Sequence, residues 1–452
     1  MWSCRRYIAT WLLIFLAGPG QVAAEPIPAL TNLPLIEAIE QALVQYPSMG
    51  VADAEFDRAR AARGEAIAGW FPSLSFSAGA TRYEEQMPAT PIHGFSPGTL
   101  PAFNDAVAQY GFHVGYTLFD GGRRRGRIRR AQSWLGAAES SRNETRQYLI
   151  ASVIITYLSV LSGREILAAH DHRLAALRAE LSRAEQFFDQ ERAAKVEILR
   201  VQAGLASAEA DREQARTGLD VAEKNLASLL GVAPENTSAP RLIPLSLSDT
   251  TKVAEASLYS AALISNSTVE QTRRRVTAAR AELTVARGAR WPALQLGGNW
   301  IDQGDFDGHR VDEWNVSAAF SLPIFSGGAI GNRITQARAT LKAAEERTRL
   351  AELALQREID QTLARLNEAQ SRINSLSRAV ESFAEVARIE KLLVKTGSGT
   401  QTAYLDAEAD LMTARATLVN ARHAEIAARV ELARLTGELD LPWVSRHLEN
   451  QP

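Results

Sequence analysis

Four segments of the chain alternate apolar and polar residues with a period of two. The first pair occupies 73–83 and 110–119, and the second pair lies within 293–323. This period predicts strands with one apolar face. Each strand has about ten residues, which is enough for a tilted strand to cross a bilayer. A soluble sheet with one buried face would alternate in the same way. If the strands lie in lipid, the lipid-facing side chains are Leu74, Phe76, Phe112, Val114, Tyr116, Leu296, Val316 and Phe320.

Long proline-free segments follow each pair of strands. Residues 123–189 are rich in Ala, Leu, Arg, Glu and Gln, and predict one helix roughly 100 Å long. A break near 191–195 precedes a return helix that ends at Gly231, and the later helices break at 396–400 and end at Gly437. Their narrow apolar stripes favour coiled-coil seams. Shorter helices are expected at 35–45, 48–68, 253–264 and 268–288.

The chain contains an internal repeat. Phe119-Asp-Gly-Gly122 recurs as Phe325-Ser-Gly-Gly328 at an offset of 206 residues, and upstream of the strands the offset is 220. The fourteen extra residues of the first copy are expected within 84–105. Gly121, Gly122, Gly327 and Gly328 are predicted strand-to-helix turns.

This periodicity divides the chain into two copies joined by a linker. Repeat 1 (25–231) has a β-hairpin at about 73–119 and a helical hairpin at about 123–231. Repeat 2 (252–437) has its hairpins at about 293–323 and 329–437. A linker (232–251) joins the copies, and a C-terminal tail (438–452) follows.

The N-terminus has the pattern of a secretory signal peptide. Arg5 and Arg6 precede an eleven-residue apolar core, and Val22-Ala-Ala24 is a small-residue cleavage site, so residues 1–24 are predicted to be removed. The single cysteine, Cys4, lies inside this signal, so the mature chain is expected to have no disulfide. No later segment is expected to be a transmembrane helix.

Charge and reactive residues restrict the possible functions. The net charge of −2 does not indicate a polyanionic partner, and a secreted chain rarely meets nucleic acid. The arginine-rich run 123–130 directly follows a strand, so we expect it at the periplasmic lipid surface, near anionic head groups, with simple solvation of the run as the alternative. His170 and His172 are two positions apart and cannot share a helix face. We find no catalytic constellation, metal cluster or cofactor motif, and expect no enzyme activity.

Four strands cannot close a membrane barrel, because the smallest lipid-spanning barrels have about eight. An open sheet in lipid would leave unpaired backbone groups at its edges. The sheet is therefore either soluble or shared between chains, and three copies would supply twelve strands. From the residues alone, the predicted fold is mainly α-helical, with four strands per chain, long helical hairpins and an internal two-fold repeat.

The order of these elements resembles the TolC-type outer-membrane efflux and secretion channels. The resemblance runs from Leu35 to Leu439. It rests on Leu35-Ile-Glu-Ala-Ile-Glu-Gln-Ala-Leu43, on Gly69-Trp-Phe-Pro-Ser-Leu74, on the two Phe-x-Gly-Gly turns, and on Gly399-Thr-Gln-Thr-Ala-Tyr-Leu-Asp-Ala407. It implies a homotrimer in the outer membrane. The fold would be a trimeric twelve-stranded transmembrane β-barrel, four strands per chain, continued by a long α-helical coiled-coil barrel as a large periplasmic extension. That extension would meet a periplasmic membrane-fusion adaptor and an inner-membrane pump of the RND or ABC type.

The resemblance also implies a narrow periplasmic aperture. Asp406 matches an acidic position of the family, and Glu197 is the first-copy equivalent of Ala403, where a second acid is expected. An arginine that latches some members is replaced by Gly399, with Lys395 nearby. A ring of carboxylates would favour cations.

Two questions stay open from the sequence. A periplasmic adaptor or coiled-coil scaffold with a soluble sheet is the alternative function, although adaptors usually carry one helical hairpin. Within the channel hypothesis, drug efflux and type I protein secretion use the same conduit, and the partners decide between them.

Overall fold

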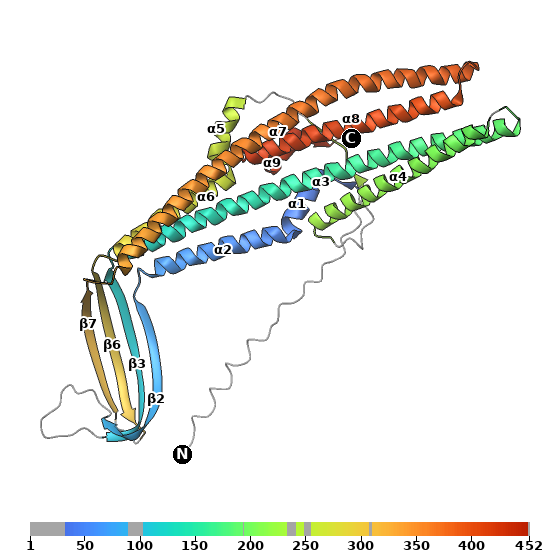
Figure 1. Ribbon diagram of the computed structural model, residues 1–452. Coiled ribbons are helices and arrows are strands. Elements are labelled where there is room, and N and C mark those ends of the chain that lie inside the picture. The colour runs from blue at the N-terminus through green and yellow to red at the C-terminus, as the bar shows by residue number, and fades with distance from the viewer. Residues whose placement is uncertain are drawn as a thin grey trace, which may run out of the picture.

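The computed structural model describes residues 32–88, 103–192, 194–232, 241–247, 255–306 and 310–450. The predicted signal peptide and most of the predicted linker lie outside the described residues, as does the middle of the insertion at 84–105. Figure 1 shows a narrow sheet at one end of a long layer of helices. The first repeat contains β1 (Asn32–Leu33), α1 (Leu35–Gln45), α2 (Pro47–Ala68), β2 (Ser73–Pro88), β3 (Phe103–Phe119), α3 (Arg123–Asp189) and α4 (Lys195–Leu229).

The second repeat follows the same order. It contains α5 (Glu255–Ser265), α6 (Ser267–Gly288), β6 (Ala293–Asp305), β7 (Arg310–Ser321), α7 (Ala329–Thr396) and α8 (Gln401–Leu435). The short strands β4 (Arg241–Leu242) and β5 (Leu245–Leu247) lie in the linker before it, and the chain continues after it as α9 (Leu441–His447) and β8 (Leu448–Asn450). Three of the four helix pairs have equal lengths, with 11 residues in α1 and α5, 22 in α2 and α6, and 35 in α4 and α8, and the fourth pair has 67 in α3 and 68 in α7. The internal repeat is therefore confirmed.

The sheet is open and antiparallel, with strand order β2-β3-β6-β7. The two hairpins have equivalent registers: Ser73 pairs with Gly115, and their repeat counterparts Ala293 and Ser321 pair in the same way. The strands have 12 to 17 residues, longer than the ten expected. Their outer parts carry charged pairs, such as Arg82 with Asp105 at 3.0 Å, which end the apolar alternation.

The helices form a layer of four rows in the same order as the strands. α2 and α4 make one edge row, α3 the next, α6 and α8 the third, and α7 the other edge. A glycine follows each return helix, α4 or α8, where its end meets the junction between two short helices. Gly231, with φ of +71°, lies so close to Gln45 that an added Cβ would be 2.7 Å from the Gln45 Cβ, and Gly437 meets Ser265 equivalently.

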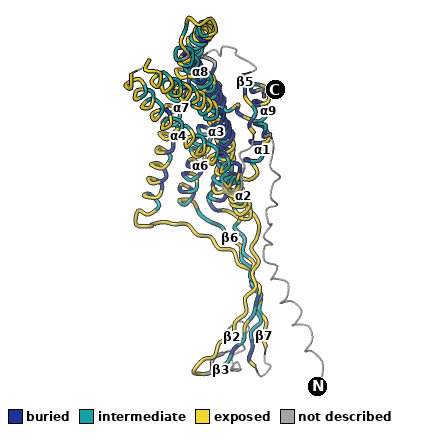
Figure 2. Tube along the Cα trace, turned by 90° about the vertical axis from the view of Figure 1, so that its right-hand side faces the viewer, coloured by how far each residue is buried: buried dark blue, intermediate teal, exposed yellow. Residues whose placement is uncertain are grey.

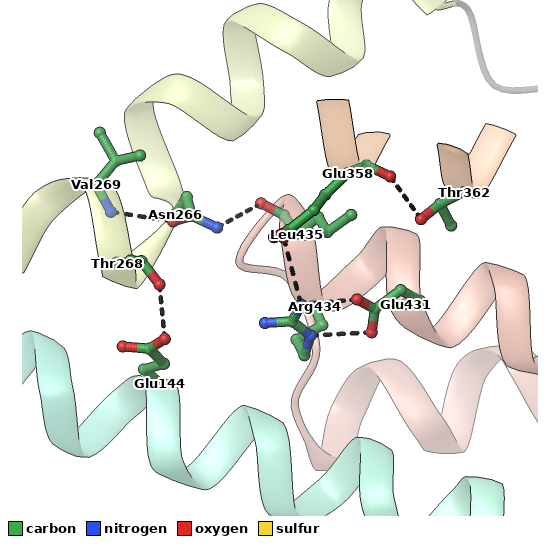
Figure 3. A network of polar contacts seen from close by, with 9 residues as sticks. All are labelled: Glu144, Asn266, Thr268, Val269, Glu358, Thr362, Glu431, Arg434 and Leu435. Carbon is green, nitrogen blue, oxygen red and sulfur yellow. Dashed lines mark hydrogen bonds and ion pairs between the residues drawn. The ribbon is translucent and has the colours of Figure 1, made fainter. Parts of the chain in front are cut away.

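A polar network fixes the second of these joints (Figure 3). Asn266 caps α6 by accepting a hydrogen bond from the Val269 N–H at 3.1 Å, and its amide donates to the Leu435 carbonyl at the end of α8, at 3.0 Å. Arg434 pairs with Glu431 at 2.7 Å and lies 3.9 Å from Glu358 of α7. The joint thus connects three helices.

The main hydrophobic core lies midway along the helices, where a strap packs against α3. The strap consists of α1, α9 and two small sheets, β1 with β4 and β5 with β8. Tyr157 of α3 is fully buried; its hydroxyl lies 2.9 Å from the Leu33 carbonyl and accepts from the Ile243 N–H at 2.7 Å. Burial raises the pKa of Tyr157 to about 12. In Figure 2 the buried residues follow this central region, whereas the sheet is largely exposed.

The strap also explains an apolar segment that the sequence analysis did not single out. One window of α3 is long and apolar enough to cross a membrane by composition, but half of it is buried inside the protein. Its residues include Ile150, Ile154 and Leu161, which belong to the strap core. The segment therefore contributes its apolar side chains to the hydrophobic core of the helical layer.

Candidate functional site

One face of the sheet carries the predicted lipid-facing side chains. Leu74, Val114 and Val316 lie in one row across the strands, and Phe76 and Phe112 lie in the next row with Trp300 and Trp314. The ring centroids of Phe76 and Phe112 are 5.2 Å apart, and those of Phe112 and Trp300 are 6.1 Å apart. Tyr116, Leu296 and Phe320 lie on the same face. The sheet therefore has a continuous apolar, aromatic surface, most of it exposed in the single chain.

A ladder of polar side chains crosses the opposite face. Ser77 Oγ lies 2.9 Å from His113 Nε2, and His113 Nδ1 lies 2.8 Å from Asn299 Oδ1. Asn299 in turn donates to Asn315 Oδ1 at 2.9 Å, so the ladder reaches all four strands. Period two placed these residues on the polar face, but the connection between them depends on strand order, which the sequence does not specify. This face suits contact with water.

The strand-to-helix turns use glycines in left-handed conformations. Gly121 and Gly122 precede α3 with φ of +67° and +83°, and Gly327 and Gly328 precede α7 with φ of +57° and +82°. Gly121 also packs closely, because an added Cβ would lie 2.5 Å from the Gly288 carbonyl oxygen. The same location before α7 is open in the single chain.

The arginine run 123–130 is only partly a surface feature. Arg124 is 5% exposed. Its Nη1 donates to the carbonyls of Thr117 at 2.8 Å and Gly69 at 3.0 Å, and its guanidinium lies 3.7 Å from the Trp70 ring centroid. The expectation that the whole run faces lipid is wrong for Arg124, because it joins the ends of α2 and β3 to the start of α3.

Asp406 lies one turn into α8, near the tip of the second helical hairpin. Asp406 is exposed in the single chain, but partial desolvation by its neighbours and, secondarily, the charge of Asp410 raise its pKa, whereas Arg173 of α3 opposes this shift. Burial also raises the pKa of Glu180 of α3, with Asp406 as the second cause. Asp406 of α8 therefore lies within electrostatic range of Glu180 and Arg173 of α3, which belong to the other helical hairpin. Glu180 and Arg173 were missed by sequence reasoning, since their proximity depends on how α3 packs on α8.

The other two candidates for the aperture, Glu197 and Lys395, have exposed side chains. Glu197 is exposed in the first turn of α4, and Lys395 is exposed in the last turn of α7. Each has the charge sign that its helix end favours. The structure gives no contact between either side chain and Asp406, so their place in an aperture stays a prediction.

The described residues contain no group of three or more His, Cys, Asp and Glu side chains that could hold a metal ion. Asp171, between the two histidines noted in the sequence, pairs with Arg212 at 2.5 Å across to α4.

Comparison with known proteins identifies the family. A family model described as outer membrane efflux protein matches residues 38–232 and 258–438, once for each repeat. The chain belongs to the outer membrane efflux protein family. The chain is therefore a subunit of a TolC-type outer-membrane efflux channel with a large periplasmic helical extension, and the alternative of a periplasmic adaptor is wrong.

Individual relatives are distant but cover most of the chain. The chain is 23% identical over 356 residues to the outer membrane efflux protein BepC of Brucella suis, covering 77% of this chain and 76% of BepC. It is 27% identical over 435 residues to the protein CyaE of Bordetella pertussis, covering 92% and 88%. The Campylobacter jejuni CmeC outer membrane channel has the same fold, with a TM-score of 0.76 at 17% identity, covering 91% and 88%.

Proposed function

We propose that three copies of this chain close into one tube, which acts as a passive exit duct across the periplasm and the outer membrane. The duct would receive its cargo from an inner-membrane pump through a periplasmic adaptor, and would itself do no chemistry. One observation carries the proposal: the strand layer and the helix layer are both open, and they end at the same two edges.

The two edge strands of the sheet need pairing partners from neighbouring copies of the chain. β2 and β7 each have an unpaired side, and in lipid each unpaired backbone group costs several kcal/mol. α2 leads directly into β2, and β7 leads into α7, so the helix layer and the sheet share their two edges. One neighbouring chain could therefore satisfy both layers at once. Three copies give the twelve strands of a closed barrel.

The repeat specifies how the copies would meet. Inside one chain, β3 of repeat 1 pairs with β6 of repeat 2, and Gly115 lies opposite Gly297. The repeat offsets carry Gly115 onto Ser321 of β7, and carry Ser77 of β2 onto Gly297. If the junction between chains copies the junction within a chain, Ser321 lies opposite Ser77 of the neighbouring copy.

The hairpin tips supply the surface for an adaptor. They lie at the far end of the molecule from the sheet (Figure 1). Phe188, Val196, Leu199 and Leu392 are exposed there. Exposed apolar groups on long helices suit a helical partner. CyaE and the pyoverdine export protein OpmQ of Pseudomonas aeruginosa are relatives, and the latter is named for an export function.

Cysteine cross-linking tests the ring directly, since the predicted mature chain has no cysteine of its own. The double variant Ser77→Cys with Ser321→Cys should oxidise to covalent dimers and trimers, visible on a non-reducing denaturing gel. Directly opposed strand residues have Cα atoms about 4.5–5.5 Å apart, within the range of a disulfide.

The matched control moves one cysteine along the same strand face. Ser73→Cys with Ser321→Cys separates the thiols by four residues, or roughly 13 Å, and should remain uncross-linked. Cross-linking of the control but not of the test pair would contradict the register. A purified protein that is monomeric in detergent and in membranes would refute the tube.

A further inference from the structure

The first two turns of α3 contain six arginines in eight residues, Arg123 to Arg130. Four of them have partners within the chain. Arg123 Nε donates to the Asp120 carbonyl at 2.9 Å, Arg124 is buried, Arg127 pairs with Asp120 at 3.3 Å, and Arg130 pairs with Glu282 of α6 at 2.5 Å. These four arginines therefore help to hold the start of α3 to the neighbouring strands and helices.

Arg125 and Arg129 remain. Both are exposed, and within the described part of the chain neither has an ion-pair partner. They are four residues apart and so lie on one face of α3, where their like charges repel each other. Positive charge is also unfavourable in the first turns of a helix. Their repeat counterparts, Gly331 and Thr335, carry no charge. An external anion would compensate a charge that the protein leaves uncompensated.

The other sides of α3 are occupied, which fixes where this pair points. Arg124 faces the end of α2, and Gly126 packs against Val285 of α6. Arg127 and Trp134 line a cleft of about 1160 Å³ beside α2, which neither Arg125 nor Arg129 lines. Leu161 packs in the core under the strap and follows Arg125 by 36 residues, which is ten full turns at 3.6 residues per turn. The two side chains therefore lie on the same face of α3, the face that the strap covers further along the helix.

This side is the outside of the proposed tube, because a strap inside it would fill the duct. α3 is also a middle row of the helical layer, between α2 and α6, and not an edge row. Neighbouring copies that join at the α2 and α7 edges would therefore leave Arg125 and Arg129 uncovered.

The height of the pair matches a lipid head-group layer. With a rise of 1.5 Å per residue, Arg125 and Arg129 lie roughly 3 Å and 9 Å below the start of α3. The polar layer on each side of a bilayer is about 5–8 Å thick. Exposed apolar side chains lie near the same level, with Ile324 94% exposed, together with Phe71 and Trp291.

We propose that Arg125 and Arg129 bind the phosphate of an anionic phospholipid in the periplasmic leaflet of the membrane that the barrel crosses. This inference rests on the proposed membrane tube. Two guanidinium groups on one face offer forked donors that match a phosphate, and the neighbouring apolar side chains suit the start of an acyl chain. Each chain provides one such site, because the second repeat lacks the arginines.

Native mass spectrometry of the full-length mature protein tests the site. Protein in neutral detergent is incubated with equal amounts of phosphatidylglycerol and phosphatidylethanolamine, and the bound lipids are counted. The wild type should retain phosphatidylglycerol preferentially. The variant Arg125→Gln with Arg129→Gln should bind it about thirtyfold more weakly, since each cation near a lipid surface contributes about fivefold, or ~1 kcal/mol.

A control variant makes the same change of charge elsewhere. Arg347 and Arg357 are exposed on α7 without ion-pair partners in the described residues, and they lie beyond the head-group layer. Arg347→Gln with Arg357→Gln should retain phosphatidylglycerol like the wild type. Equal retention by the wild type and the Arg125/Arg129 variant, or equal loss in both variants, would overturn the site.

Two further measurements separate the possible failures. Millimolar inorganic phosphate should leave the bound phosphatidylglycerol in place, and full displacement would mean that the pair recognises the free anion. Channel conductance of the Arg125/Arg129 variant in neutral phosphatidylcholine bilayers should equal that of the wild type. If neither protein conducts, it is the tube that fails, whereas normal conductance with unchanged lipid retention refutes the lipid site alone.

Discussion

Glu191 has an unfavourable backbone conformation at the tip of the first helical hairpin. Among the residues that the structure describes, it is the one non-glycine residue with a positive φ, +58°. Its repeat counterpart is Gly397, with φ of +79°. A side chain in this region costs about 1–2 kcal/mol, which a glycine avoids in part. We therefore expect Glu191→Gly to stabilise the end of α3 by about 1 kcal/mol.

Hydrogen exchange at the last turn of α3 measures this effect. A gain of about 1 kcal/mol should slow amide exchange roughly fivefold there, because local opening becomes rarer. Gly397→Ala is the matched control, and should speed exchange at the end of α7. Unchanged or faster exchange in Glu191→Gly would mean that the Glu191 side chain stabilises the tip.

Asp406 should control ion selectivity in a pH-dependent way. Its pKa is raised, so its negative charge is lost at a higher pH than the charge of an ordinary aspartate. Cation preference in planar bilayers should therefore fall as the pH falls through this raised pKa. Asp406→Asn should have a weak cation preference at neutral pH and little pH dependence. Selectivity equal to that of the wild type would place Asp406 outside the pore.

The residues around Asp406 mark where sequence reasoning reached its limit. Asp406 and Asp410 are four positions apart on a predicted helix, so their shared face was visible in the sequence. Glu180 and Arg173 are more than two hundred positions away, and only the packing of α3 on α8 brings them near. Similarly, no pattern distinguishes the buried Arg124 from the exposed Arg125.

At the scale of elements, the contact between α3 and α8 includes a titratable group. His423 Nδ1 of α8 lies 2.6 Å from Ser162 Oγ of α3. Burial lowers the pKa of His423 to about 4 from an ordinary 6.5. The folded protein thus holds this imidazole neutral where the unfolded chain would protonate it. Its contribution to stability is complete above pH 6.5 and declines as the pH falls from 6.5 to about 4.

The variant His423→Gln should remove this pH dependence while keeping a partner for Ser162. Protonation of the wild-type residue costs up to about 3 kcal/mol, given about 1.4 kcal/mol per pKa unit. Urea unfolding followed by circular dichroism at pH 7.5 and pH 4.5 measures the difference. The wild type should lose more stability than His423→Gln between these values. Equal losses would mean that His423 opens to solvent without cost.

The long elements were predictable and the short ones were not. The absence of proline and the glycine after β3 placed the start of α3 at Arg123, and the same signals apply to α7. The strap escaped prediction, because β1 and β4 have two residues each and carry no periodic signal. The sequence predicts only a tail at 438–452, yet α9 and β8 place Trp443, Val444 and Leu448 in the main core.

At the scale of the whole molecule, the contact between the two repeats of one chain can be compared with the proposed contact between neighbouring chains. Phe119 is the last residue of β3, pairs with Leu294 of β6 and is 48% exposed. Its counterpart Phe325 follows β7, the edge strand, and is 90% exposed. If the copies close as the repeats do, β2 and the residues before it in the neighbouring chain cover Phe325 to the same extent.

Phe325→Ser should therefore weaken assembly without disturbing the fold of the single chain. Full burial of a phenylalanine contributes about 1.5–3 kcal/mol, so partial cover contributes about 1 kcal/mol at each of three junctions. The fraction of trimer in detergent, measured by light scattering during dilution, should fall at a higher protein concentration than in the wild type. Phe119→Ser is the matched comparison, and should lower the melting temperature of the chain itself. A trimer of Phe325→Ser as resistant to dilution as the wild type would show that the junction between chains differs from the junction within them.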